Sequence, residues 1–213
     1  EESAPPSFAQ RSQWTRYWLV DPLDGTKEFV NRNGEFTVNI ALIDGHDAVF
    51  GVVGVPVQNK VYVGDVNQSD LSLRAYVEIN GDKHLLPGKS YDEDAKVVRV
   101  VASRNHGGER LESYLAELAS QFADCERRPV GSSLKLCVLA EGGADIYPRL
   151  GPTSEWDIGA AQAVLTAAGG GVYQPDGESL AYNTKESLLN PEFLAVGDAS
   201  YPWRERLPAF PAR

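Results

Sequence analysis

The amino-acid sequence predicts an α+β fold, with an antiparallel meander in its first half and strands alternating with helices in its second. In the first half, short apolar runs follow one another across turn sequences such as Asp44-Gly45 and Asn80-Gly81. In the second half, strand-like runs alternate with helical patterns. The chain has 213 residues, enough to bury a substantial core, and we place a boundary between residues 1–94 and 95–213.

The first half is predicted to be mostly β. Residues 3–16 are polar and contain prolines, which is typical of a loop. A short strand over 16–20 runs into a turn, and a short helix over 25–32 ends near Asn33-Gly34. Further strands are expected at 36–43, 48–53 and 60–64, with a weaker one at 71–79. Short connections between these strands favour antiparallel pairing.

The second half follows a polar, loop-like stretch at 88–94. Its predicted helices cover 109–121, 133–141 and a segment from Thr153 or Ser154 to about Ala168. Its predicted strands cover 97–102, 144–147 and 193–196. Glycine clusters end the second and third helices, as expected for helix stops.

Composition excludes several classes of function. The net charge is −10 and the pI is about 4.8, so the surface should repel nucleic acid and anionic membranes. An anionic ligand would therefore need positive charge inside its site, and metal ions are the obvious source. No apolar run approaches the ~18 residues of a membrane span. Cys125 and Cys137 lack the spacing of a zinc site, which favours buried thiols in a reducing cytoplasm.

The segment from Trp18 to Phe29 is the most informative part of the chain. An apolar strand is followed by Asp21 and Asp24, and then by Gly25-Thr26 at the start of a helix. Clustered carboxylates beside free backbone N–H groups suit divalent cations and a phosphate. Asp-Pro and Asp-Gly also mark ordinary turns, so a turn without a ligand is the alternative.

Asp157 is a third candidate carboxylate, at the start of the last long helix. An Asp in a first turn is often only a partner of the helix dipole, worth about 0.3–1 kcal/mol. Three converging carboxylates without cations would repel one another and raise each other's pKa values. Two Mg²⁺ ions about 3.5–4 Å apart would relieve this repulsion and could bind both oxygens of a phosphoryl transfer.

The joint pattern resembles the inositol monophosphatase superfamily of Mg²⁺-dependent, lithium-sensitive phosphatases, and within it the bacterial 3′(2′),5′-bisphosphate nucleotidases. The segments that carry the resemblance are 21–29, 32–42, 103–106, 131–135, 147–153 and Trp156-Asp157. It extends over nearly the whole chain. It implies a layered α-β-α-β-α sandwich, with an antiparallel sheet from the first half and a mixed sheet with helices from the second, and with the site between them.

The resemblance also implies roles for individual residues. The metal ligands would be Glu1, Asp21, Leu23 through its carbonyl, Asp24 and Asp157, and they would hold two or three Mg²⁺ ions. Thr26, Asp21 and Asp24 would be catalytic, with the Thr26 hydroxyl orienting a metal-activated water. The full substrate-binding set would be Glu1, Leu23, Asp24, Gly25, Thr26, His106, Ser132, Lys135, Arg149 and Asp157.

The implied substrate is adenosine 3′,5′-bisphosphate, which would be cleaved to AMP and phosphate. Its 5′-phosphosulfate analogue, a metabolite of sulfur metabolism, is a second expected substrate. Lys135, His106 and Arg149 also have simpler interpretations, as a solvated helix residue, a loop residue and a surface ion pair. The expected location is the cytoplasm, or peripherally the cytoplasmic face of the inner membrane, and a homodimer is left open.

The resemblance further implies helices and strands before Glu1, which supply an acidic partner for Thr26. We therefore expect this exact chain to be weakly active or inactive, while its parent protein is a phosphatase. Equal phosphate release by this chain and by one carrying the upstream segment would contradict that expectation.

Three competing interpretations stay open at this point. The first is an inositol monophosphatase or fructose-1,6-bisphosphatase-like sugar phosphatase. The second is a nucleotide-binding fragment without turnover, and the third is a domain whose acids merely cap helices. Other phosphatase chemistries fit poorly, because the sequence has neither Asp-x-Asp spacing at Asp21 nor a Cys-x5-Arg motif at Cys125, and it has no P-loop.

Overall fold

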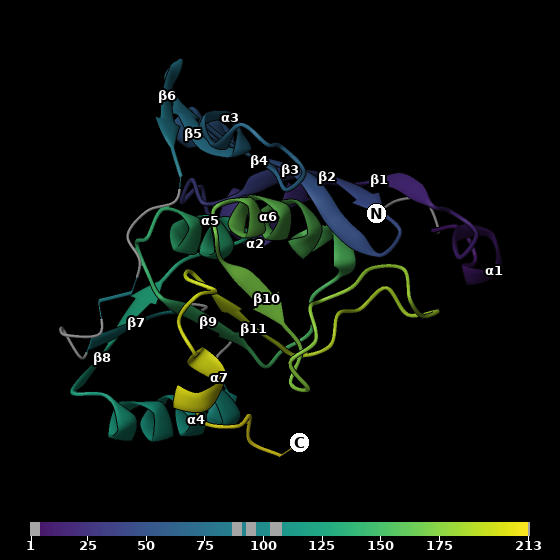
Figure 1. The fold of residues 1–213 in the computed structure, drawn as a ribbon. Coiled ribbons are helices and arrows are strands. Elements are labelled where there is room, and N and C mark those ends of the chain that lie inside the picture. The colour runs from purple at the N-terminus through teal and green to yellow at the C-terminus, as the bar shows by residue number, and fades with distance from the viewer. Residues whose placement is uncertain (1–4, 87–90, 93–96, 103–107, 213) are drawn as a thin grey trace.

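The computed structural model describes residues 5–86, 91–92, 97–102 and 108–212, which form two stacked sheets with helices between and outside them (Figure 1). The first sheet is fully antiparallel, in the order β1-β2-β3-β4-β5-β6. Its strands are Arg16–Asp24, Thr37–Asp44, Asp47–Val55, Lys60–Asp65, Ala75–Ile79 and Asp82–Leu85. The meander predicted from the short turns is therefore confirmed.

The second sheet is mixed, in the order β10-β11-β9-β7-β8. Its strands β7 to β11 are Val97–Ala102, Asp124–Pro129, Ile146–Arg149, Gly171–Tyr173 and Phe193–Val196. β7 pairs parallel with β8 and β9, and the other pairs are antiparallel. This architecture confirms the predicted α+β class with its mixed second sheet.

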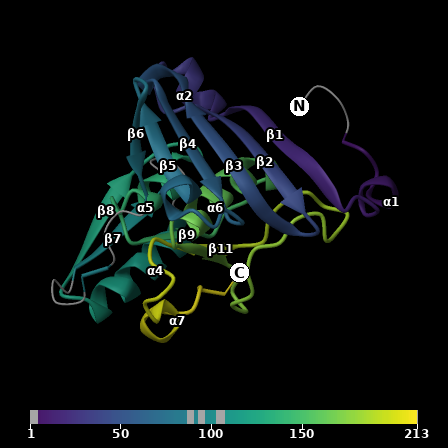
Figure 2. The same cartoon turned by 45° about the horizontal axis from the view of Figure 1, so that its top comes forward.

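The helices complete the layers (Figures 1 and 2). α5 and α6 lie between the two sheets, and α4 and α7 lie on the far side of the second sheet. The helices α1 to α7 are Phe8–Arg11, Thr26–Val30, Leu71–Arg74, Gly108–Gln121, Leu134–Ala140, Glu155–Ala167 and Trp203–Arg206, and a 3₁₀ turn covers Pro56–Gln58.

Two sequence predictions are corrected by the structure. The segment 3–16, predicted as a loop, contains the single turn α1, because the buried Arg11 donates hydrogen bonds to Asn183 Oδ1 and to the backbone carbonyls of residues 185 and 186. The predicted strand 71–79 begins as α3 and becomes a strand only at Ala75. Most of the predicted loop 88–94 lies outside the described residues, and the division at residue 94 stays a prediction.

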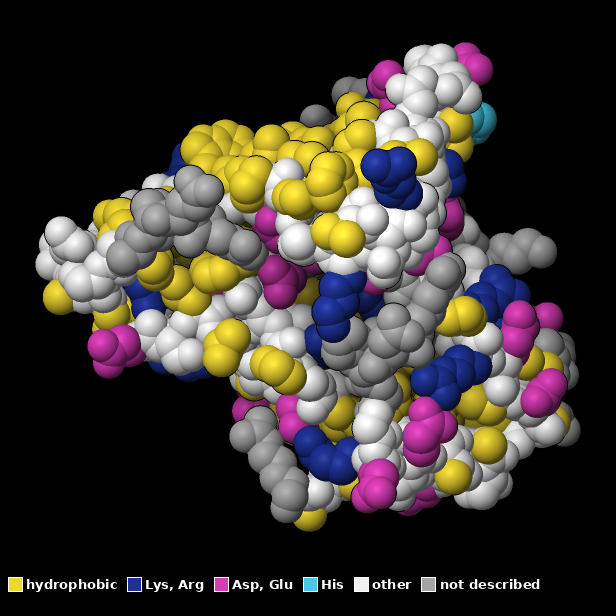
Figure 3. All heavy atoms as spheres, turned by 180° about the vertical axis from the view of Figure 1, so that it is seen from behind, with side chains coloured by type: hydrophobic (Ala, Val, Ile, Leu, Met, Phe, Trp, Pro, Cys, Tyr) yellow, Lys and Arg dark blue, Asp and Glu magenta, His cyan; other side chains and the backbone are white. Residues whose placement is uncertain are grey.

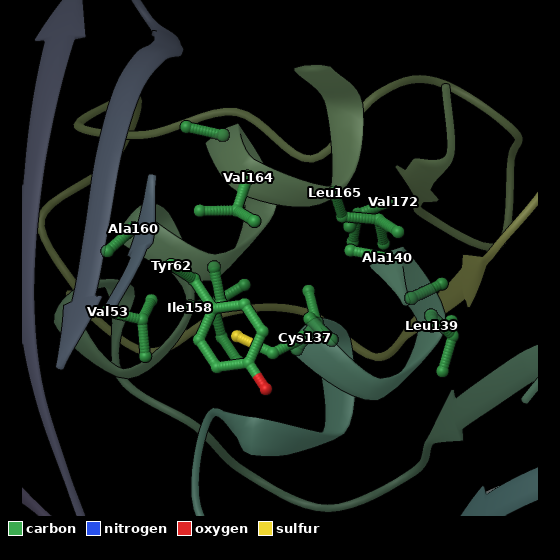
Figure 4. Packing of buried hydrophobic residues seen from close by; sticks show 14 of the residues in the cluster. Val53, Tyr62, Cys137, Leu139, Ala140, Ile158, Ala160, Val164, Leu165 and Val172 are labelled. Atoms are coloured by element: carbon green, nitrogen blue, oxygen red, sulfur yellow. The ribbon is translucent and has the colours of Figure 1, made fainter. Parts of the chain in front are cut away.

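Two glycines let α6 lie directly against the first sheet. A Cβ atom at Gly51 would lie 2.1 Å from the Ala160 carbonyl oxygen, and one at Gly64 would lie 2.4 Å from the Val164 Cα. Figure 4 shows Ile158 and Val164 of α6 beside Tyr62 of the sheet, all within one core cluster. Because the helix is held this closely, its N-terminus has a fixed position relative to β1.

We expect Gly51→Ala to lower the free energy of unfolding by about 1–3 kcal/mol, because the added methyl group meets the helix backbone rather than a flexible side chain. Gly54→Ala on the same strand is the matched control, since its Cβ would be 3.9 Å from Val38. Urea unfolding of both variants checks this. Equal losses would show that the strand preferences of glycine and alanine, rather than close packing against α6, govern these positions.

The outer face of the first sheet is apolar. Trp18 is 59% exposed and Val20 is 49% exposed, and Ile40, which is paired with Val20, lies on the same face. Figure 3 shows apolar side chains gathered along the first sheet at the top of that view. Large exposed apolar patches are uncommon on monomers. The outer helical layer of the predicted α-β-α-β-α sandwich stays a prediction that the described residues do not test.

Candidate metal and phosphate site

The end of β1 presents two of the three candidate carboxylates. The pairing of β1 with β2 shifts register between Asp21 and Asp24, so the strand is irregular where these residues lie. The Leu23 backbone N–H donates to Asp21 Oδ1 at 3.0 Å, which folds the Asp-Pro-Leu segment into a tight turn. Gly25 follows with φ of 85°, a left-handed conformation that glycine adopts without steric cost, and α2 begins at Thr26.

The third carboxylate comes from the start of α6. Ser154 is the N-cap, and its backbone N–H donates to Asp157 Oδ2 at 2.8 Å in a capping box. Because α6 lies against the first sheet, this turn reaches the end of β1. One carboxylate oxygen from each of Asp21, Asp24 and Asp157 lies within 4.8 Å of the others. Asp157 thus caps its helix and also lies in the carboxylate cluster.

The electrostatics of this cluster favour a bound cation. Asp21 is only 4% exposed. Burial raises the pKa of Asp24, partly offset by the hydrogen bond from the Ser133 backbone N–H and by the charge of Lys135. Carboxylates in such surroundings ionise more readily when a cation is present. An all-oxygen donor set fits hard cations such as Mg²⁺ or Ca²⁺, and this chemistry is consistent with the predicted metal site.

A cavity of about 180 Å³ is lined by Asp24 and Asp157 and also by the cationic side chains of Lys135 and Arg149. Lys135 is buried, and its Nζ donates to the Ser132 carbonyl at 2.9 Å. Burial and the nearby Arg149 lower the pKa of Lys135 to about 8. Arg149 donates to the carbonyls of Gly151 and Pro152, which fixes its guanidinium at the edge of the cavity. Acidic and basic groups thus face a shared space.

The structure brings most of the predicted site residues together. Asp24, Gly25, Ser132, Lys135, Arg149 and Asp157 all line the cavity. Ser132 has φ of 44°, and its Oγ donates to the Glu35 carbonyl. Thr26 is exposed at the start of α2. Glu1 and His106 lie outside the described residues.

Sequence reasoning missed further residues of the cavity, namely Glu28, Ser133, Leu136, Tyr147, Thr153 and Ile158. Glu28 could have been found, because it lies one helical turn after Gly25 and so faces the same side of α2. Tyr147 and Ser133 lie within the segments that carry the resemblance, but no local pattern predicts that β9 and the start of α5 line the same cavity as Asp24.

Comparisons with known proteins agree with this arrangement. A profile of the inositol monophosphatase family matches residues 1–204. The 3′(2′),5′-bisphosphate nucleotidase CysQ of Shigella flexneri is 46% identical over 192 residues, covering 90% of this chain and 72% of the relative. The enzyme of the same name from Escherichia coli K12 is 44% identical over 195 residues, with the same coverage.

Solved structures give the same result. The crystal structure of CysQ from Bacteroides thetaiotaomicron, described as a bacterial member of the inositol monophosphatase family, superimposes with a TM-score of 0.81 at 40% identity. The match covers 92% of this chain and 74% of that one. Mycobacterium tuberculosis SuhB shares the fold, with a TM-score of 0.60 at 24% identity. That match covers 87% of this chain and 68% of the SuhB chain.

Within the described ranges, every helix is too short or too polar to cross a membrane.

Proposed function

The chain belongs to the inositol monophosphatase family, and from this we propose that it hydrolyses the 3′-phosphate of adenosine 3′,5′-bisphosphate to give AMP and phosphate. It is a metal-dependent phosphoric monoester hydrolase of the bisphosphate nucleotidase branch, as the relatives at 44–46% identity indicate. The observation that carries the proposal is the cluster of three carboxylates beside a cavity with two cationic side chains. The 5′-phosphosulfate analogue is the second proposed substrate.

The proposed metal is Mg²⁺, in two or three ions. Asp21, Asp24 and Asp157 would hold it, with the Leu23 carbonyl and Glu1 as further proposed ligands. When bound, Mg²⁺ lowers the pKa of a water molecule and neutralises charge on a phosphate. Asp21 and Asp24 keep their carboxylates in place through the turn at Leu23 and the hydrogen bonds to Asp24.

The other residues would bind and orient the nucleotide. The backbone N–H groups of Gly25 and Thr26 are proposed to donate to the phosphate that is cleaved, because they open α2 beside Asp24. Lys135 and Arg149 are proposed to attract the second phosphate, assisted by Ser132 and His106. The buried Lys135 ammonium is already held by its hydrogen bond to the Ser132 carbonyl, so it can bind an incoming dianion with little further ordering of its side chain.

Phosphate release from adenosine 3′,5′-bisphosphate, with Mg²⁺ and with a chelator, tests the proposal. Parallel assays measure phosphate release from inositol 1-phosphate and from fructose 1,6-bisphosphate. Faster release from the nucleotide than from either sugar phosphate would exclude the sugar phosphatase alternative. Calorimetry with the bisphosphate separates an enzyme from a binding fragment. Tight binding that needs no metal and releases no phosphate would contradict the proposed activity.

Lys135 should make substrate affinity depend on pH. Its pKa is lowered to about 8, so its positive charge is lost as the pH rises through that value. We expect KM for the bisphosphate to increase above pH 8. In Lys135→Met, KM should already be raised at pH 7 and should stay flat across pH 7–9, whereas Lys83→Met, on the distant β6, should behave as wild type. A wild-type KM that does not change over this range would contradict the assigned role.

A further inference from the structure

A cluster of buried polar side chains lies behind Asp24, where the first sheet meets α5. Thr37 and Asn39 lie on β2, and Ser133 lies at the start of α5. Their exposed fractions are 0%, 1% and 2%. Buried hydroxyl groups cost free energy unless they are hydrogen-bonded, so such a cluster is retained only where its bonds are made.

Two donors of this cluster hold one oxygen of Asp24. The Ser133 backbone N–H donates to Asp24 Oδ2 at 2.6 Å, and the Thr37 hydroxyl donates to the same oxygen at 3.2 Å. Hydrogen bonds to an ionised carboxylate are stronger than neutral ones. The two donors come from different elements, β2 and the start of α5, and together they restrict rotation of the Asp24 side chain.

The Thr37 hydroxyl is itself held in place. It lies 2.8 Å from Ser133 Oγ, which donates to Asn39 Oδ1 at 2.8 Å. A hydroxyl group has one proton and can accept a second bond. Because Thr37 donates its one proton to Asp24, the single proton of Ser133 Oγ is available to either Thr37 Oγ1 or Asn39 Oδ1, which both lie 2.8 Å from it. The three side chains thus form one hydrogen-bonded unit.

We propose that Thr37 and Ser133 are positioning residues that set the orientation of Asp24 toward the metal site. The inference rests on the proposed function, because it assumes that Asp24 is a metal ligand. The Thr37 hydroxyl is buried and lies outside the carboxylate cluster, so it acts on the site through Asp24, whereas Ser133 also lines the cavity. Partners of this kind fix the direction of a metal ligand, and their loss typically costs about 10–100-fold in metal affinity or activity.

Thr37→Val tests the proposal, because it keeps the branched shape and removes the hydroxyl. We expect the half-saturating Mg²⁺ concentration for phosphate release to rise by about tenfold, with KM for the nucleotide at saturating Mg²⁺ unchanged within about twofold. Thr37→Ser, which restores the hydroxyl, should recover wild-type Mg²⁺ dependence. Thr37→Val combined with Ser133→Ala should cost less than the two single changes added together, since the residues act as one unit.

Calorimetric titration with Mg²⁺ alone gives a measurement independent of turnover, so it remains decisive if the proposed substrate is wrong. Weaker Mg²⁺ binding in Thr37→Val than in wild type and Thr37→Ser supports the positioning role. A lower melting temperature with unchanged Mg²⁺ binding would overturn it, because that is the result of a purely structural role. Absence of Mg²⁺ binding by the wild-type chain would overturn it as well.

Discussion

In the full-length parent protein, Asp21→Asn is expected to reduce Mg²⁺-dependent phosphate release by about 100-fold or more while the chain stays folded. The side chain is buried, and its Oδ1 accepts a hydrogen bond from the Leu23 N–H within the turn. The amide oxygen of Asn can keep that bond, so the local conformation survives. The amide carries no negative charge, however, and a cluster reduced from three carboxylates to two binds divalent cations less tightly.

Asp47→Asn is the matched control for this change. It removes one negative charge from an exposed position on β3 and should leave the rate unchanged. Thermal unfolding with and without Mg²⁺ adds a second readout. Wild type should be stabilised by Mg²⁺ and Asp21→Asn should not, because a ligand stabilises only the state that binds it. Retention of even a tenth of the wild-type rate would count strongly against Asp21 as a metal ligand.

The site could be predicted from the sequence to the extent that its residues are close together in the chain. Asp21 and Asp24 are three residues apart at a strand end, and Asp157 stands out because it opens a long helix. Ser133 carried no comparable signal, because its backbone N–H reaches Asp24 from a helix 109 residues further along the chain. Contacts between distant segments are fixed by how the layers pack, and no local pattern records them.

The same distinction explains the elements that were missed. The strands of the first sheet alternate in burial and are joined by short turns, so their pattern is local. Strand β8 contains four charged residues in six and has no apolar pattern, yet it pairs in parallel with β7 along its whole length. It is an edge strand held by backbone hydrogen bonds, which are independent of side-chain type.

The ion pair of Arg99 and Asp145 provides the largest predicted effect on stability. Arg99 on β7 donates to Asp145 through Nε at 3.0 Å and Nη2 at 2.5 Å, and its backbone N–H donates to the same carboxylate at 2.6 Å. A further bond from Nη1 reaches the Gly142 carbonyl at 2.8 Å. The Asp145 side chain is only 3% exposed, whereas that of Arg99 is 25% exposed. The pair therefore joins β7 to the turn that precedes β9.

Arg99→Met should lower the free energy of unfolding by about 3–5 kcal/mol, because the Asp145 carboxylate would stay buried without a cationic partner. The exposed pair of Arg127 and Glu112 is the control, and Arg127→Met should cost less than about 1 kcal/mol. Urea unfolding at neutral pH measures both. Similar losses in the two variants would mean that water reaches Asp145 once Arg99 is removed. A large loss for Arg99→Met alone would show that the link between β7 and β9, which carries Arg149 to the edge of the cavity, depends on a buried charge pair.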